Sequence, residues 1–288
     1  ERFTGIEVLT FCLMDNHFHL LLKVDPEKKY VSEKELLQRI EALYGKAFAD
    51  ETKKKWGEEK AQGHDAWVKQ QQQVYLDRMQ DLSGFMKELK QRFTQWFNKR
   101  KDRRGPLWED RFKSVLVEGS DQALMTIANY IDLNPVRGGL ADDPKDYRWC
   151  GYGAATGGDP DARNGLLELM QILQRAKTWK IAAEKYRLCL FADGKDTPER
   201  KGFDPDQVRD VIEKNGTLSS FEILRCRVRY FSDGVALGSR TFVEQIFEEH
   251  RKLFSEKRSE GRRAMRCGGW EGLQTMRALR GGALEVEP

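Results

Sequence analysis

Two short apolar runs near the start of the chain alternate with polar positions. They span residues 7–14 and 17–24, and Asp15 and Asn16 between them tolerate the positive φ of a two-residue turn. The pattern therefore predicts a β-hairpin. In its second strand the even positions from 18 to 24 are Phe, Leu, Leu and Val, whereas His17 and His19 occupy odd positions. Side chains two apart share a face, so we expect the even positions to be buried and both histidines to lie on the opposite face.

Apolar residues at helical spacing follow the hairpin. Residues 32–44 open with Ser32 and Glu35 at the spacing of a capping box, which predicts a helix. Residues 49–73 are charged and glutamine-rich, and we interpret them as an insertion of weak helix or loop. A further helix is expected over residues 75–101, and it ends at a turn that contains Gly105 and Pro106.

The next segment predicts a strand over residues 112–117 and then a helix that begins at Ser120 and is stopped by Pro135. Its apolar stripe follows an i, i+3, i+4, i+7 spacing from Leu124 to Ile131. Two strands, a helix, a strand and a helix make up most of an α+β fold with a ferredoxin-like antiparallel sheet. One strand and one helix of that fold are lacking at the front.

A stretch rich in Gly, Asp and Pro over residues 151–164 indicates a domain boundary. We expect a first domain at 1–152, with the insertion at 49–73 inside it, a helical connector at 153–203, and a helical C-terminal region with a basic tail at 204–288. Residues 205–214 and 219–229 flank an Asn-Gly break, which is compatible with a helix-turn-helix and equally with an ordinary helix pair.

Composition narrows the class of protein. The chain has 288 residues, a formal net charge of +4 and five cysteines that form no CxxC pair. The odd, scattered cysteines argue against a disulfide scaffold or a zinc ribbon and favour a reducing compartment. The longest apolar run is far shorter than the roughly 20 residues of a membrane span. We therefore expect a soluble cytoplasmic protein.

The charge is concentrated in one place. Residues 87–113 hold ten basic and four acidic residues, a local charge of +6. A polyanion is the natural partner of such a stripe, although a solvated helix face would have the same composition. The cations and the aromatic residue that we expect to contact DNA are Lys99, Arg100, Lys101, Arg103, Arg104 and Trp108.

Four polar residues carry candidate chemistry. His17 and His19 are about 6.6 Å apart along one strand face, close enough to bind one ion. Tyr130 and Asn134 lie one helical turn apart at the border of the apolar stripe. Taken singly, the residues favour a structural interpretation: Tyr130 as a core-edge aromatic and Asn134 as a helix-terminal residue before Pro135.

Together the motifs are more specific. The segments MDNHFHLLL, LWEDRFKSVLV and NYIDLNPVRGGL, with a trailing DYRWCGYGAA, resemble the REP-associated tyrosine transposases over residues 6–152. These belong to the single-tyrosine branch of the HUH single-strand endonucleases. The resemblance implies that His17 and His19 bind the metal, that Tyr130 is the nucleophile and that Asn134 is the third ligand. It implies Mg²⁺ or Mn²⁺ as cofactor, and a 5′-phosphotyrosine intermediate.

The chain departs from the family in several places. Asp15 stands where the family usually has Pro, Asp132 where His is common and Gly138 where Ala is common. None of these removes a reacting group. Relatives also carry a central strand and a helix before the hairpin, so we expect a further segment to precede residue 1.

The expected activity is transposase-like: cleavage and rejoining of single-stranded DNA beside hairpin-forming elements, in association with a bacterial nucleoid. Partners are single-stranded or hairpin DNA and no membrane, and the resemblance allows either a monomer or a dimer. The alternative is a DNA-binding protein or repressor that keeps the fold without catalysis. The intact set of His17, His19, Tyr130 and Asn134 argues against it.

Overall fold

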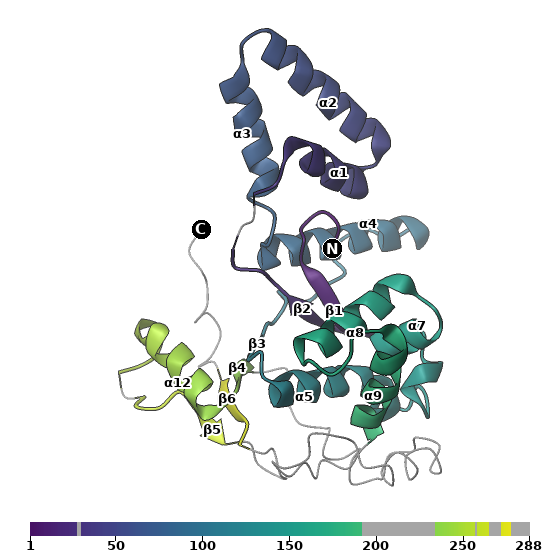
Figure 1. The fold of residues 1–288 in the computed structure, drawn as a ribbon, viewed down its shortest axis with the longest axis vertical. Helices are drawn as coiled ribbons and strands as arrows, with labels where there is room; N and C mark the ends of the chain where they lie inside the picture. Colours follow the sequence, from purple (N-terminus) through teal and green to yellow (C-terminus); the bar gives the residue numbers. More distant parts are fainter. Residues whose placement is uncertain (28–29, 192–233, 257, 265–271, 278–288) are drawn as a thin grey trace. The chain divides into compact units, whose positions relative to one another are not determined.

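The computed structural model describes residues 1–27, 30–191, 234–256, 258–264 and 272–277 (Figure 1). It has a mixed α and β fold whose described part divides into two compact units. One comprises residues 1–8 and 22–112, and the other residues 9–21 and 113–288. The second unit runs through residue 152, where the sequence suggests a boundary. The boundary at 203 and the helix-turn-helix candidate lie outside the described residues.

The predicted hairpin is present. Strands β1 (Glu7–Leu13) and β2 (Phe18–Lys23) form a two-stranded sheet. The turn between them is closed by the amide of Met14, which donates to the carbonyl of His17 at 2.8 Å. The segment of β1 and β2 nearest this turn, with its two histidines, belongs to the second unit.

The face of β2 that is buried is not the predicted one. Leu21, on the same face of the strand as the histidines, is only 5% exposed, whereas Phe18, Leu20 and Leu22 are half-buried. Leu21 belongs to the core cluster that also contains Ile127 of the helix that carries Tyr130. The histidine-bearing face is thus covered by a helix, which alternation along one strand cannot reveal.

Four helices make up most of the first unit (Figure 1). Three of them, α1, α2 and α3, pack around a small core that contains Leu36, Ile40, Trp56 and Val68. The capping prediction for α1 is confirmed, because the side chain of Ser32 accepts from the amide of Glu35 at 3.3 Å. The insertion is two full helices rather than weak helix or loop. The bounds of the four helices are α1 Glu33–Tyr44, α2 Lys46–Ala61, α3 Asp65–Leu76 and α4 Leu82–Arg100.

Helix α4 begins seven residues later than predicted. Gln80 has a φ of 55°, which interrupts helical backbone, and the side chain of Asp81 then caps α4 by accepting from the amide of Ser83. Residues 75 and 76 instead end α3. The apolar spacing ran across this break because both helices use the same 3.6-residue period.

The described part of the second unit holds six α-helices and two short 3-10 helices, of which α12 and η3 lie in the C-terminal region. Helices α5, α8 and α9 contribute to one hydrophobic core, to which β1 and β2 contribute Leu9, Cys12 and Leu21. Figure 1 shows α7, α8 and α9 grouped beside α5. The bounds are α5 Asp121–Asp132, α6 Asn134–Arg137, η1 Pro144–Asp146, α7 Gly151–Thr156, α8 Pro160–Ile172 and α9 Trp179–Phe191.

A second, four-stranded sheet corrects two expectations. The strand predicted over residues 112–117 is reduced to β3 (Leu116–Val117), and it pairs in parallel with β4. The C-terminal region, predicted to be helical, contains strands as well as α12 and the 3-10 helix η3. The sheet order is β3-β4-β6-β5. The remaining bounds are β4 Gly234–Gly238, α12 Arg240–Glu249, η3 Arg251–Leu253, β5 Arg263–Ala264 and β6 Gln274–Arg277.

The described strands form one sheet of two strands and one of four, in a fold compatible with the predicted α+β class. Side-chain hydrogen bonds stabilise the pairing of β3 with β4. Glu118, directly after β3, accepts from both the amide and the hydroxyl of Ser239, directly after β4, at 2.7 and 2.8 Å. Leu237 of β4 is fully buried. None of the helices in the described part of the chain has the length and apolarity needed to cross a membrane.

Candidate active site

The two histidines lie close together, His17 in the turn just before β2 and His19 within the strand. Their ring centroids are 5.0 Å apart, with the ring planes at 86°. His17 is exposed, and its Nδ1 lies 2.6 Å from Oδ1 of Asn16 in the turn. His19 is half-buried, one step further into the strand. The period-two spacing of the sequence therefore brings both imidazoles to one place on one face.

Tyr130 meets the same face from α5. Its ring centroid is 5.6 Å from that of His19, with an interplanar angle of 75°. The position follows from the helical period: Ile127 and Ile131 are buried in the core, and Tyr130, at the edge of this stripe, is only partly covered. The tyrosine and the histidine are thus adjacent although 111 positions separate them.

Asn134 opens α6, one turn beyond Tyr130, and is only 6% exposed. Its Nδ2 donates to the carbonyl of Tyr130 at 3.0 Å, which fixes the amide against the end of α5. Its Oδ1 accepts from Nη1 of Arg137 at 3.1 Å. The oxygen that the sequence analysis assigns to a metal is therefore held by a cation in this structure.

Arg137 is the residue that the sequence analysis missed. Its guanidinium carbon lies 4.5 Å from the ring centroid of Tyr130, and it also contacts Asn134. The spacing carries a signal, because positions 130, 134 and 137 are related by i+4 and i+3 and so share one helical face. The Pro135 between them concealed it, since a proline indicates a helix end rather than a new turn.

The electrostatics of the site favour a neutral His19. Burial, then the charge of His17 and then that of Arg137, lower the pKa of His19 to about 4. At neutral pH this imidazole is uncharged and keeps a ring nitrogen lone pair. A neutral imidazole is the form that binds a metal ion.

The residues fit a divalent ion by type. Two imidazoles and an amide oxygen are neutral donors that suit Mn²⁺ somewhat better than Mg²⁺. For Asn134 to complete the set, its Oδ1 must exchange Arg137 for the ion. Within the described ranges no three His, Cys, Asp or Glu side chains gather as an alternative metal cluster.

Asp132 anchors the helix end that carries the site. It is fully buried, and its carboxylate accepts from Thr10 Oγ1 at 2.8 Å, from Tyr186 Oη at 2.5 Å and from the amide of Tyr152 at 2.9 Å. Burial raises the pKa of Asp132 to about 6, even though these hydrogen bonds oppose the shift. Asp132 is thus a structural carboxylate that fixes the end of α5.

The cations expected to bind DNA lie at the end of α4 and in the loop after it. All five are exposed: Lys99, Arg100, Lys101, Arg103 and Arg104. Arg100 lies over the ring of Trp96 at 5.8 Å, and in the described part of the chain none of the five forms an ion pair with a carboxylate. Trp108 is half-buried, and its Nε1 donates to the carbonyl of Lys90 at 3.1 Å.

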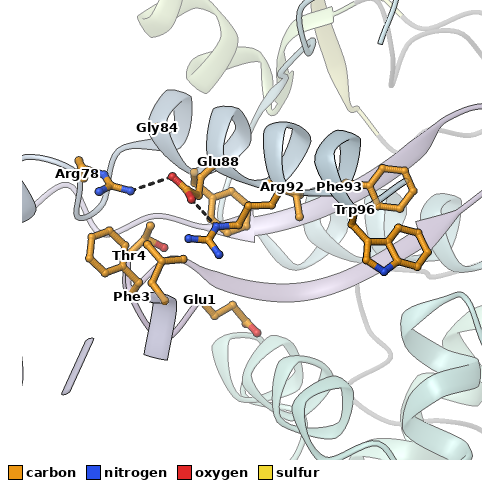
Figure 2. Close-up of a pocket in the computed structure, with 12 residues that line it drawn as sticks. Glu1, Phe3, Thr4, Arg78, Gly84, Glu88, Arg92, Phe93 and Trp96 are labelled. Carbon is orange, nitrogen blue, oxygen red and sulfur yellow. Dashed lines mark hydrogen bonds and ion pairs between the residues drawn. The ribbon is translucent and has the colours of Figure 1, made fainter. Parts of the chain in front are cut away.

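An apolar surface continues along α4. Phe93 and Trp96 are 42% and 55% exposed, with ring centroids 5.6 Å apart. They line a cavity of about 390 Å³ that also contains an ion-pair network in which Glu88 binds Arg78 and Arg92 (Figure 2). The two arginines are balanced by Glu88 and Glu1, so the charge of this cavity does not favour an anion.

No protein-family model, no curated protein and no solved structure matches this chain.

Proposed function

We propose that this chain is a metal-dependent single-stranded DNA endonuclease and strand transferase that acts beside hairpin-forming elements, with Tyr130 as nucleophile. The observation that carries the proposal is that the rings of His17 and His19, and of His19 and Tyr130, lie side by side, with Asn134 hydrogen-bonded to the carbonyl of Tyr130. Two segments far apart in the sequence bring an imidazole pair and a phenol within ring contact. A HUH-type nuclease fold for residues 6–152 is part of the same proposal.

The reaction needs an activated nucleophile and a group that neutralises the negative charge of the phosphate. A phenol with a pKa near 10 is only about 0.1% ionised at pH 7, so attack on a phosphodiester requires help. His17, His19 and Asn134 would hold Mg²⁺ or Mn²⁺, which when bound neutralises phosphate charge and fixes an in-line geometry.

Tyr130 then forms the new bond. Its Oη attacks phosphorus, the bond to the 3′-oxygen breaks, and the phenolic proton ends on the released 3′-hydroxyl. The product is a 5′-phosphotyrosine. Because one phosphodiester replaces another, a later attack by a 3′-hydroxyl can rejoin the strand without a nucleotide cofactor.

The surface at the end of α4 supports the choice of substrate. Five exposed cations without carboxylate partners in the described chain, next to the exposed ring of Trp96, suit a flexible backbone and its bases. We propose single-stranded or hairpin DNA as partner, with a monomer or a dimer as the acting form and the nucleoid as its location.

The test is a covalent trap. Labelled single-stranded DNA with a hairpin is incubated with the protein and Mn²⁺, and denaturing gels show whether label stays on the protein. We expect an adduct with wild type and none with Tyr130→Phe, which keeps the ring and removes only the oxygen. Tyr147→Phe is the matched control, and it should form the adduct.

Two results would reject the nuclease. If wild type binds the DNA without forming an adduct, a non-catalytic DNA-binding protein is the better description. If Tyr130→Phe cleaves at the wild-type rate, the nucleophile assignment is wrong.

A further inference from the structure

We infer that Arg137 is a further catalytic residue, whose guanidinium binds a non-bridging oxygen of the phosphodiester that Tyr130 attacks. This inference rests on the proposed function. It adds a permanent cation to a set otherwise made of two imidazoles, a phenol and an amide.

Arg137 lies beside both Tyr130 and Asn134. Its guanidinium carbon is 4.5 Å from the ring centroid of Tyr130, and its Nη1 is 3.1 Å from Oδ1 of Asn134. One side chain thus contacts both the nucleophile and the residue assigned to the metal. A phosphate approached by Tyr130 would come within reach of the same guanidinium.

Arg137 also has an unused hydrogen-bond donor. Nε of Arg137 is buried and has no hydrogen-bond partner among the described residues. A guanidinium has five N–H donors in a planar fork that matches two phosphate oxygens, and leaving a buried donor unpaired is costly. An incoming phosphate oxygen would satisfy it.

The chemistry fixes the role. Arginine stays protonated in proteins, so Arg137 neither takes nor gives a proton during the step. It stabilises the negative charge that spreads over the phosphate oxygens as the bond to Tyr130 forms and the bond to the 3′-oxygen breaks. The phenolic proton of Tyr130 still ends on the released 3′-hydroxyl.

A purely positioning role is the competing explanation. Arg137 would then only hold Asn134 Oδ1, and its loss would act through the metal site. The two roles differ in a measurement without DNA. Mn²⁺ affinity falls when Arg137 is replaced if Arg137 orients the ligand, and it does not fall if Arg137 contacts phosphate, because its loss then only frees Oδ1 of Asn134.

The experiment uses the full chain with Arg137→Gln, Arg137→Lys and Arg137→Ala. Arg148→Gln is the matched control, because Arg148 also lies over an aromatic ring, 4.6 Å from that of Trp149, but contacts no candidate site residue. Adduct formation is followed in single-turnover reactions with hairpin single-stranded DNA. Mn²⁺ affinity is measured by electron paramagnetic resonance without DNA.

We expect Arg137→Gln to slow adduct formation by about 10²–10³-fold, the usual cost of losing one charge-stabilising donor. Arg137→Lys, which keeps charge without the fork, should lose less, and free guanidinium should partly restore Arg137→Ala. Mn²⁺ affinity should not fall, and Arg148→Gln should react like wild type.

Three results overturn the inference. Arg137→Gln reacting at the wild-type rate is the first. A loss that disappears at high Mn²⁺, matched by weaker Mn²⁺ binding, assigns Arg137 to positioning only. If wild type forms no adduct, the proposed function itself fails and the inference falls with it. If Arg137→Gln does not fold, the Arg137→Lys and guanidinium results decide.

Discussion

The hydroxyl of Tyr186 on α9 donates to Oδ2 of Asp132 on α5 at 2.5 Å, and neither residue is exposed to solvent. Asp132 lies between Tyr130 and Asn134 in the sequence. A residue from the region after position 152 therefore holds the helix end that carries the candidate nucleophile. Helices α8 and α9 are part of the same core as the site rather than an independent appendage.

Tyr186→Phe should lower the free energy of unfolding by about 1.5–3 kcal/mol, because it removes a hydrogen bond to a buried carboxylate. The ring stays in place, and Thr10 and the amide of Tyr152 still bind Asp132. Urea unfolding followed by circular dichroism measures the loss. Tyr147→Phe is the control, since its hydroxyl donates to the carbonyl of Leu13 at an exposed position and should cost less. Equal losses would contradict the anchoring role.

The local elements could be predicted from the sequence where capping and period agree. Ser32 and its spacing to Glu35 marked the start of α1 within one residue. The start of α4 was wrong because Gln80 adopts a positive φ without being Gly, which no residue pattern announces. Strand β4 was missed because its five residues, GVALG, are too few to distinguish a buried strand from a helix segment.

For the candidate site, the positions of residues within one strand or helix could be predicted, but the contacts between elements could not. The strand period predicted that His17 and His19 share a face, and the helix period placed Tyr130 beside the core. Which face α5 covers depends on tertiary packing, and so does the contact of Arg137 with Tyr130 across the Pro135 break. Contacts between elements were outside the reach of periodicity, whereas positions within one element were not.

The acid stability of the second unit should depend on Asp143. Burial raises the pKa of this carboxyl, but hydrogen bonds from Arg187 and from the amide of Lys145, with the charge of Arg187, outweigh it, so the pKa is lowered. A lowered carboxyl pKa stabilises the folded state above the unfolded value of about 3.9, and this stabilisation is lost as the pH falls through the folded value.

Asp143→Asn should therefore reduce stability at pH 7 by about 1–3 kcal/mol and flatten the loss of stability below about pH 4. Nη2 of Arg187 lies 2.8 Å from Oδ2 of Asp143 and would lose its charged partner. Thermal unfolding from pH 3 to pH 7 gives the profile. Asp142→Asn, at the exposed neighbouring position, should keep the wild-type profile. An unchanged acid limb in Asp143→Asn would reject this assignment.

DNA affinity should depend on salt through the cations at the end of α4. Replacing Lys99 and Arg104 with Gln should lower the slope of log affinity against log salt by about 1.4, at roughly 0.7 per single-strand phosphate contact. Fluorescence anisotropy with a labelled single strand from 50 to 300 mM salt, about a sixfold range, measures it. Lys53→Gln with Lys69→Gln removes the same charge from exposed positions on α2 and α3 and should leave the slope unchanged. Equal slopes for the two double variants would mean that the basic stripe is only a solvated face.

Asn134 should set the metal requirement of the reaction. Asn134→Ala removes the amide oxygen, so the Mn²⁺ concentration for half-maximal adduct formation should rise at least about tenfold, with residual reaction at high Mn²⁺ because Tyr130 is still present. Asn134→Asp keeps an oxygen that can bind either the ion or Arg137, and it should stay near the wild-type requirement.

Asn129→Ala separates this effect from a loss of packing. Asn129 is on α5, next to Tyr130, but its Nδ2 donates to the carbonyl of Cys189 at 2.8 Å rather than to a residue of the candidate site. Its replacement should lower stability without moving the Mn²⁺ requirement, whereas Asn134→Ala should move both, because its Nδ2 also binds the carbonyl of Tyr130. If Asn134→Ala loses stability but keeps the wild-type Mn²⁺ requirement, then Asn134 is a helix-terminal residue only. In that case its bond to Arg137 serves to position the arginine, and the metal would have to be held by His17 and His19 without it.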